Sequence, residues 1–223
     1  MKETGILMTK ENIVAIQEGI KTQTRRVIKP QPHEGCGHIK VEYFFPTKVN
    51  RKGEEYPGDE IFGAYSDDGE WGCKCPYGQV GDFLYLKEAH YRYGMWVVDG
   101  VTKTGRQKWR FIVSNLDFNF RYLEIDPLVI QDNRHKILGW YKRSPLFMPK
   151  KYARYWYEII SIRAERLNEI SLEDIWKEGI LEIVYNPLRD RALFKSLWDS
   201  INAARGYSWD SNCWVWSIEF KEV

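Results

Sequence analysis

The sequence lacks any long apolar run. No stretch of the 223 residues approaches the roughly 20 apolar residues that a helix needs to cross a bilayer. The first residues, MKETG, are not followed by the apolar segment of a signal peptide. A cytoplasmic protein is therefore expected, and no membrane partner.

Several chemical signatures are missing as well. The chain contains no Walker loop, no dinucleotide-binding glycine fingerprint and no Gly-x-Ser-x-Gly elbow. No internal repeat is visible. Because the sequence contains none of these cofactor-binding patterns, no cofactor is expected.

The chain also lacks a strong charge of one sign. Its 33 basic and 31 acidic residues give a net charge of +2, which by itself is too small to indicate a nucleic-acid partner. Hydrophobic residues at 43% and charged residues at 29% are typical of a soluble globular protein. Basic residues concentrate at two places. The first holds Lys21, Arg25, Arg26 and Lys29, and the second holds Lys142, Arg143, Lys150, Lys151 and Arg154.

Cysteine is scarce, and disulfides are not expected in a cytoplasmic chain. Cys36, His38, Cys73 and Cys75, with His33 nearby, nevertheless offer the thiolate and imidazole ligands that zinc prefers. The Cys-x-His and Cys-x-Cys spacings are tighter than the usual ligand gaps. A structural zinc that pins an insertion loop is therefore an alternative to no metal at all.

Aromatic residues are plentiful, with 10 Trp, 14 Tyr and 10 Phe. A β-rich core explains them, because aromatic side chains suit half-buried pleated surfaces. A surface on which nucleic-acid bases stack is the sharper alternative. Both interpretations stay open for any single aromatic residue.

Periodicity and turn signals predict more strands than helices. The predicted strands cover 6–8, 39–45, 83–88, 108–113, a long stretch from Trp156, and 213–220. The predicted helices run from Thr9 to Gly19, from Ser171 to Gly179 and over 188–201. Residues 30–80 and 92–150 otherwise look rich in loops.

This pattern indicates an α+β fold. A small β-barrel carrying peripheral helices fits it better than a doubly wound sheet. Residues 1–223 are expected to form a single domain with insertions at about 33–72 and 95–140.

The segment GIKTQTRR at 19–26 follows the first helix and is the strongest candidate for chemistry. Lys21 stands three residues before Thr24, and a partly desolvated lysine can take the proton of a threonine hydroxyl and make it a nucleophile. Arg25 and Arg26 can lower the affinity of Lys21 for its proton, or hold a phosphate. The bland alternative is that the threonines are ordinary strand residues and the cations are solvated.

Three further residues are candidates for the same site. Glu178 comes at the end of a predicted helix, where the macrodipole disfavours a carboxylate, which suits a general acid or base. Glu88 ends an apolar strand, and Arg154 lies near a basic loop that can contact a backbone phosphate. His90 and His135 have no partner at metal-ligand spacing and are expected to be structural.

Five blocks of sequence, in order, carry a resemblance to a known family. They read GIKTQTRRVIKPQP, CPYGQVGDFLYLKEAHY, FMPKKYARYWYEIISIRAERLNEIS, EDIWKEGI and LWDSINAARGYSWDSNCWVWSIEF. Together they resemble phage and prophage ASCH-domain proteins of the PUA-like superfamily. The resemblance is weakest over about 33–72 and 95–140.

The resemblance implies a PUA-like β-barrel whose cleft binds RNA or a modified nucleoside. Small bacterial ASCH proteins include amidohydrolases that remove the acyl group from N4-acetylcytidine. Their motif, Gly-x-Lys-Thr-x-Thr-x-Arg, places the catalytic lysine at Lys21, the threonine at Thr24 and the arginine at Arg26. Their glutamate corresponds to Glu178. Thr22, Arg25, Glu88 and Arg154 are then predicted to bind substrate together with Arg26.

The same resemblance leaves rival functions open. The chain is about twice as long as the compact hydrolases, and its insertions can reshape the cleft. A non-catalytic reader of nucleic acid or of a modified base is the main alternative. A ribonuclease and a protein-interaction factor in phage morphogenesis are the others, because fold alone does not fix chemistry.

Overall fold

The computed structural model describes residues 1–124, 129–130, 136–180 and 186–223. The chain divides into two compact units. The first comprises Met1–Gly5, Glu11–Tyr85 and Tyr155–Val223, and the second comprises Ile6–Lys10 and Leu86–Arg154. His135, predicted to be structural, lies outside the described residues. The single domain with two insertions stays a prediction.

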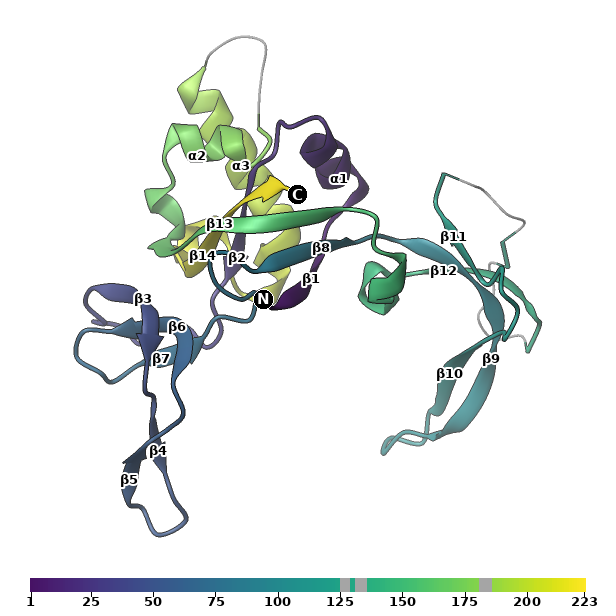
Figure 1. Cartoon of the computed structure of the whole chain (residues 1–223), viewed down its shortest axis with the longest axis horizontal. Helices are drawn as coiled ribbons and strands as arrows, with labels where there is room; N and C mark the ends of the chain where they lie inside the picture. The colour runs from purple at the N-terminus through teal and green to yellow at the C-terminus, as the bar shows by residue number, and fades with distance from the viewer. Residues whose placement is uncertain (125–128, 131–135, 181–185) are drawn as a thin grey trace. The chain divides into compact units, whose positions relative to one another are not determined.

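The first unit is built on a five-stranded sheet with the strand order β1-β8-β13-β14-β2 (Figure 1). Its strands are β1 (Glu3–Leu7), β8 (Phe83–Lys87), β13 (Trp156–Arg166), β14 (Trp214–Glu222) and β2 (Gln23–Val27). β14 runs antiparallel to both neighbours, with Trp216 opposite Ala164 on one side and Arg26 on the other. The described pairings leave this sheet open, since β1 and β2 are its two end strands.

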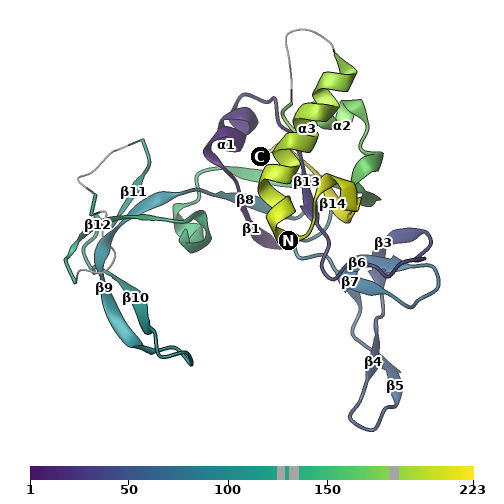
Figure 2. The ribbon, with the colours of Figure 1, turned by 180° about the vertical axis from the view of Figure 1, so that it is seen from behind.

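Three α-helices belong to the first unit: α1 (Lys10–Gln17), α2 (Leu172–Lys177) and α3 (Pro187–Asn202). The hydroxyl of Ser171 caps α2 by accepting from the Asp174 amide, and the side chain of Asn186 caps α3 in the same way. Pro187 then occupies the first turn of α3, where its missing N–H costs nothing. Figures 1 and 2 show α3 lying across one face of the sheet with α2 beside it.

The core between these helices and the sheet is apolar and aromatic. It combines Ile175 of α2, Phe194 and Trp198 of α3, and Val215 of β14 with neighbouring buried residues. Aromatic side chains therefore do serve the core here, as one of the two interpretations of their abundance expects.

Residues 30–80 contain more regular structure than their glycines and prolines suggest. A three-stranded sheet has the order β3-β6-β7 and a separate ribbon pairs β4 with β5. The strands are β3 (Ile39–Phe44), β4 (Thr47–Val49), β5 (Glu55–Pro57), β6 (Ile61–Ser66) and β7 (Gly72–Lys74). Short strands of this kind give little periodic signal, and only the one at 39–45 was predicted.

The second unit is a four-stranded sheet in which β9 pairs with β10, β11 and β12. These strands are β9 (His90–Val101), β10 (Gln107–Val113), β11 (Phe120–Tyr122) and β12 (Gly139–Arg143). The prediction of a loop-rich region with one strand over 92–150 was wrong. β9 begins with three buried residues in a row and ends largely exposed, so it shows no two-residue alternation to detect.

The α+β class is confirmed, with strands in several sheets and few helices. Short 3-10 turns complete the described elements, at Pro145–Phe147, Lys150–Tyr152, Leu167–Glu169, Ala203–Arg205 and Trp209–Ser211. No helix among the described residues is both long and apolar enough to span a bilayer.

Candidate functional site

A pocket of about 400 Å³ lies in the first unit, beside strand β2. Its volume falls within the range of small-molecule sites. Side chains from β2, from the segment after β7, from the end of α2 and from α3 line it. Its basic lining residues are Lys21, Arg25, Arg26, Lys29, Lys74 and Arg205, against one acidic residue, Glu178, in the described part of the lining.

Lys21 and Glu178 form a buried pair in this pocket. The Lys21 Nζ donates to the Glu178 carboxylate Oε2 at 2.5 Å and to the Glu178 backbone carbonyl at 2.8 Å. Their side chains are 3% and 7% exposed. Two residues that are 157 positions apart in the sequence therefore meet, and the sequence analysis named both as candidates for one site.

The backbone around the pair explains why the two side chains meet. The Lys21 amide donates to the Ala15 carbonyl at the end of α1, and an isolated antiparallel bridge joins Lys21 to Glu178. Gly179 ends α2 with φ of +91°, and a Cβ there would lie 3.2 Å from the Lys21 Cβ. Glycine therefore meets two needs at this position, the left-handed turn and the close approach of Lys21.

Burial sets the electrostatics of Lys21. Loss of hydration lowers the pKa of Lys21, which outweighs the opposing attraction of Glu178, and the charges of Arg26 and Arg25 act in the same direction as burial. A neutral amine has two N–H groups and one lone pair. Both N–H groups can be donated to Glu178, which leaves the lone pair to accept a proton.

Arg25 is held by carboxylates of the protein. Its Nη2 contacts Glu165 at 2.5 Å and Asp174 at 2.9 Å, and its Nη1 lies 3.3 Å from Glu178 and 2.6 Å from the Gln23 amide oxygen. A guanidinium with these partners positions Glu178 and neutralises the cluster. This arrangement favours a positioning role for Arg25 over the predicted contact with substrate.

Thr24 and Arg26 alternate with Gln23 and Arg25 along β2, so they project to the other face of the strand. Thr24 is 4% exposed and lines the same pocket as Lys21. Burial lowers the pKa of Arg26, and the neighbouring charge of Arg205 adds to the effect. Excess positive charge in a desolvated wall favours an anionic ligand or a developing oxyanion.

Aromatic rings line the pocket beside these cations. Tyr77, Trp198, Tyr207 and Trp216 contribute to the lining, and the Lys29 ammonium lies 4.8 Å from the centre of the Tyr207 ring. Burial raises the pKa of Tyr77, so its hydroxyl stays protonated at neutral pH. Rings and cations together suit a ligand that has both a flat ring and a negative group.

The structure brings together only some of the predicted site residues. Lys21, Thr24, Arg25, Arg26 and Glu178 all line the pocket. Thr22 is not among the lining residues, and its described contacts are the backbone bonds to Lys177 and Phe220.

Glu88 and Arg154 belong to the second unit and pair with each other. The Arg154 Nε and Nη2 donate to the two carboxylate oxygens of Glu88 at 3.0 and 2.8 Å. Neither residue is among the described lining of the pocket. A bidentate pair of this kind accounts for both residues structurally.

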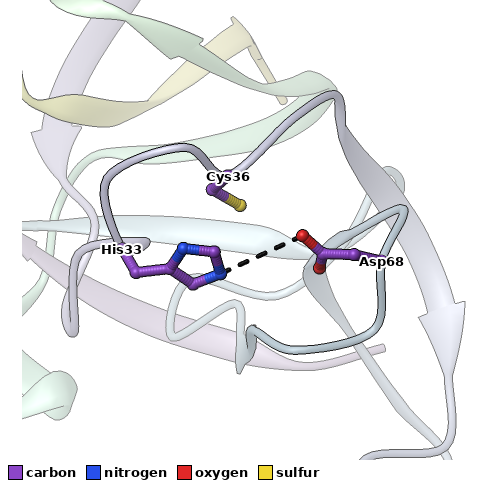
Figure 3. A group of neighbouring side chains, drawn as sticks. All are labelled: His33, Cys36 and Asp68. Carbon is purple, nitrogen blue, oxygen red and sulfur yellow. Dashed lines mark ion pairs between the residues drawn. The ribbon is translucent and has the colours of Figure 1, made fainter.

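The structure does not bring the four predicted zinc ligands together as one group of possible metal ligands among the described residues. The predicted set was Cys36, His38, Cys73 and Cys75. The group that the described residues do form consists of His33, Cys36 and Asp68 (Figure 3). Burial raises the pKa of the Cys73 thiol to about 11 and shifts the pKa of the Cys75 thiol in the same direction.

Sequence reasoning missed several lining residues. Lys74 and Tyr77 come from the stretch 30–80, which was predicted to be rich in loops, and Arg205 comes from the turn after α3. Asp174 and Glu165, which hold Arg25, were also missed. No local pattern marks them, because their role depends on contacts between distant segments.

Comparison with known proteins adds no relative to this description: no family model, curated protein or solved structure matches the chain.

Proposed function

We propose that this protein is an ASCH-type protein that binds RNA or a modified nucleoside in the pocket beside β2 and hydrolyses the amide of an N4-acylated cytosine. The observation that carries the proposal is the buried Lys21–Glu178 pair in a pocket also lined by Thr24 and Arg26. The resemblance of the GIKTQTRR segment to the hydrolase motif supports the same residues. The proposed fold is the PUA-like barrel type, supported by its α+β class and by the antiparallel pairing of β13, β14 and β2.

The proposed reaction has two steps. Lys21 takes the proton of the Thr24 hydroxyl, and the Thr24 oxygen bonds to the acyl carbon while the carbon–N4 bond breaks. Lys21 returns the proton to N4, and cytidine leaves. Lys21 then takes a proton from water, and the hydroxide oxygen bonds to the acyl carbon while the bond to the Thr24 oxygen breaks. Lys21 returns the proton to the Thr24 oxygen, and the carboxylic acid leaves.

Each neighbouring group has a defined part in this scheme. Glu178 accepts both N–H groups of Lys21 and so directs its lone pair. Arg26 stabilises the negative charge that develops on the acyl oxygen. Arg25 touches neither substrate nor reacting atoms, and it holds Glu178 in place.

Incubation of the purified protein with N4-acetylcytidine tests the proposal, with cytidine and acetate measured by chromatography. Thr24→Ala removes the nucleophile and is expected to lower turnover by at least about 10³-fold. Thr24→Ser keeps a hydroxyl and is expected to retain part of the activity. Thr22→Ala is the matched control, and a loss that falls on Thr22 instead of Thr24 would overturn the assignment.

A non-catalytic reader is the second candidate, favoured by the aromatic and cationic lining of the pocket. It predicts binding of single-stranded RNA or a nucleotide that survives Thr24→Ala and weakens in Arg26→Ala. Absence of turnover by the wild type, together with this binding pattern, selects the reader over the hydrolase.

A further inference from the structure

Two turns of the first unit meet at the end of the three-stranded sheet. One is the turn His33–Cys36, closed by a bond from the Cys36 amide to the His33 carbonyl. The other joins β6 to β7 and contains Asp68. Pairing of Ile39 with Ser66, and a bond from the Asp67 amide to the His38 carbonyl, bring the turns together.

Three different ligand types converge between these turns. An imidazole nitrogen of His33, the Sγ of Cys36 and a carboxylate oxygen of Asp68 all lie within 4.8 Å of one another. Figure 3 shows the three side chains directed at a common space, with His33 and Asp68 facing each other. Cys36 is buried at 9% exposure, whereas His33 and Asp68 are each about two-fifths exposed, so the space is reachable from solvent.

The hydrogen bonds around the group select which atoms can bind a ligand. The His33 Nδ1 lies 3.0 Å from the Glu34 carbonyl, which can only accept, so the proton of a neutral ring sits on Nδ1 and Nε2 carries the lone pair. The Asp68 Oδ1 accepts from the Ser66 hydroxyl at 2.5 Å and from the Glu70 amide at 3.0 Å. The other oxygen, Oδ2, faces the His33 Nε2 at 4.0 Å.

This is the arrangement that metal sites use to orient their ligands. A histidine that donates its second nitrogen to a backbone carbonyl, and a carboxylate fixed through one oxygen, present their remaining atoms in a set direction. Zinc ligands at about 2.0–2.3 Å from the ion lie about 3.5 Å apart in a tetrahedron. The three ligand atoms therefore need to close by only about one ångström.

We propose that His33, Cys36 and Asp68 bind a divalent zinc-type cation, which clamps the two turns together. The mixed sulfur, nitrogen and oxygen set suits Zn²⁺ or Co²⁺ better than the oxygen-preferring Mg²⁺ or Ca²⁺. Glu70, whose Oε2 lies 3.6 Å from the His33 Nε2, or a water molecule fills the fourth position. The clamp steadies β7, which ends at Lys74 of the pocket wall and leads to Tyr77.

Titration of the untagged, metal-free full chain with Co²⁺ tests the site. A thiolate ligand gives a charge-transfer absorption band, and tetrahedral coordination gives intense visible bands. Both are expected at one equivalent of Co²⁺ and are expected to disappear when Zn²⁺ is added. Cys36→Ser is expected to abolish the charge-transfer band. Asp68→Asn and His33→Ala are each expected to weaken Co²⁺ binding by about tenfold to a hundredfold.

Matched controls separate this site from the other cysteines and histidines nearby. His38→Ala and Cys73→Ser change the same residue types in the same region and are expected to leave the titration unchanged. Circular dichroism of each variant checks that it is folded. Absence of the charge-transfer band in the folded wild type would overturn the proposal. A band that survives in folded His33→Ala and Asp68→Asn but is lost in Cys73→Ser would overturn it as well.

Discussion

At the scale of single residues, the buried cluster around β2 concentrates charge where water is scarce. Lys21 and Arg25 share the carboxylate of Glu178, and Arg25 also contacts Glu165 and Asp174. Burying charges is unfavourable unless each has a partner in good geometry. Removal of any one charged side chain from the cluster is therefore expected to destabilise the fold, although the cluster as a whole contributes little to the free energy of unfolding.

The first prediction concerns the shared carboxylate. Glu178→Gln removes the negative charge and leaves the buried Arg25 guanidinium less compensated, so the free energy of unfolding is expected to fall by about 3 kcal/mol or more. Denaturant unfolding measures this. The exposed pair of Lys195 and Asp210 is the matched control, and Asp210→Asn is expected to leave the free energy of unfolding nearly unchanged. Equal small effects in both variants would contradict the buried-pair interpretation.

The second prediction concerns His90 in the second unit. Its ring is fully buried, stacks on Phe120 at 4.9 Å between ring centres and contacts the Glu88 carbonyl through Nδ1. Burial lowers the pKa of His90 to about 4. The unfolded chain takes up a proton below about pH 6.5, whereas the folded histidine stays neutral to about pH 4. Stability is therefore expected to decrease as the pH falls through this window.

This loss amounts to at most about 3 kcal/mol. Urea unfolding at pH 7 and at pH 4.5 measures it. His90→Gln cannot titrate, so the part of the pH dependence that belongs to His90 is expected to vanish in this variant. His38→Gln changes an exposed histidine and is expected to keep the wild-type slope. An unchanged slope in folded His90→Gln would show that other groups cause the dependence.

At the scale of elements, the end of α2 determines the position of Glu178. Gly179 and Gly206 both have positive φ, at +91° and +85°, but only the first faces a close neighbour, the Lys21 side chain. Alanine at either position is expected to cost about 1–2 kcal/mol through backbone strain. Gly179→Ala is expected to cost more, since its Cβ also displaces Lys21.

Thermal or denaturant unfolding gives the two costs, and turnover or ligand binding gives their effect on the pocket. Only Gly179→Ala is expected to impair the pocket, because nothing lies within 4 Å of a Cβ at Gly206. A loss of the same size in Gly206→Ala would mean that general destabilisation, and not displacement of Lys21, is responsible.

Elements with strong local signals were predictable from the sequence. The capping serine of α2, the glycines that follow α1 and α2, and the alternation of β14 predicted those elements to within a few residues. β9 and the short strands β4, β5 and β7 were not, because glycines, exposed faces or brevity remove the periodic signal. Tertiary pairing, not local preference, forms these strands.

The candidate site divides in the same way. Lys21, Thr24, Arg25, Arg26 and Glu178 were predicted from the sequence, partly through a family resemblance, and all five line one pocket. The partners of Arg25 and the regrouping of Cys36 with His33 and Asp68 were not predictable. Both depend on which distant turns and strands pack together, and the spacing of residues along the chain does not predict such tertiary contacts.

At the scale of the whole molecule, acidic and basic residues nearly balance, whereas basic residues predominate in the described lining of the pocket. A net charge of +2 gives little long-range attraction for a polyanion, so the proposed binding of RNA is expected to depend on the pocket. Six basic residues that all contacted phosphates would give a plot of log K against log salt with a slope of about −4. Lys21 and Arg25 already bond to protein carboxylates. A shallower slope is therefore expected for a short single-stranded RNA.

Fluorescence anisotropy at several salt concentrations measures this slope. Lys74→Ala and Arg205→Ala are each expected to reduce its magnitude by about 0.7 if the residue contacts a phosphate. Lys195→Ala, on α3 but outside the described lining of the pocket, is the matched control and is expected to change nothing. A slope steeper than that of six contacts would place the RNA on a larger surface than the pocket.

The position of β14 between β13 and β2 has a consequence for how the protein is made. β14 pairs residues 214–222 with β13 on one side and with β2, near the start of the chain, on the other. During synthesis β2 leaves the ribosome long before the strand it must pair with. Until then its polar and basic side chains have no sheet to join, so the pocket can assemble only after nearly all of this sequence has emerged. Contacts of such sequence separation close slowly, and the interval is one in which a chaperone has time to act.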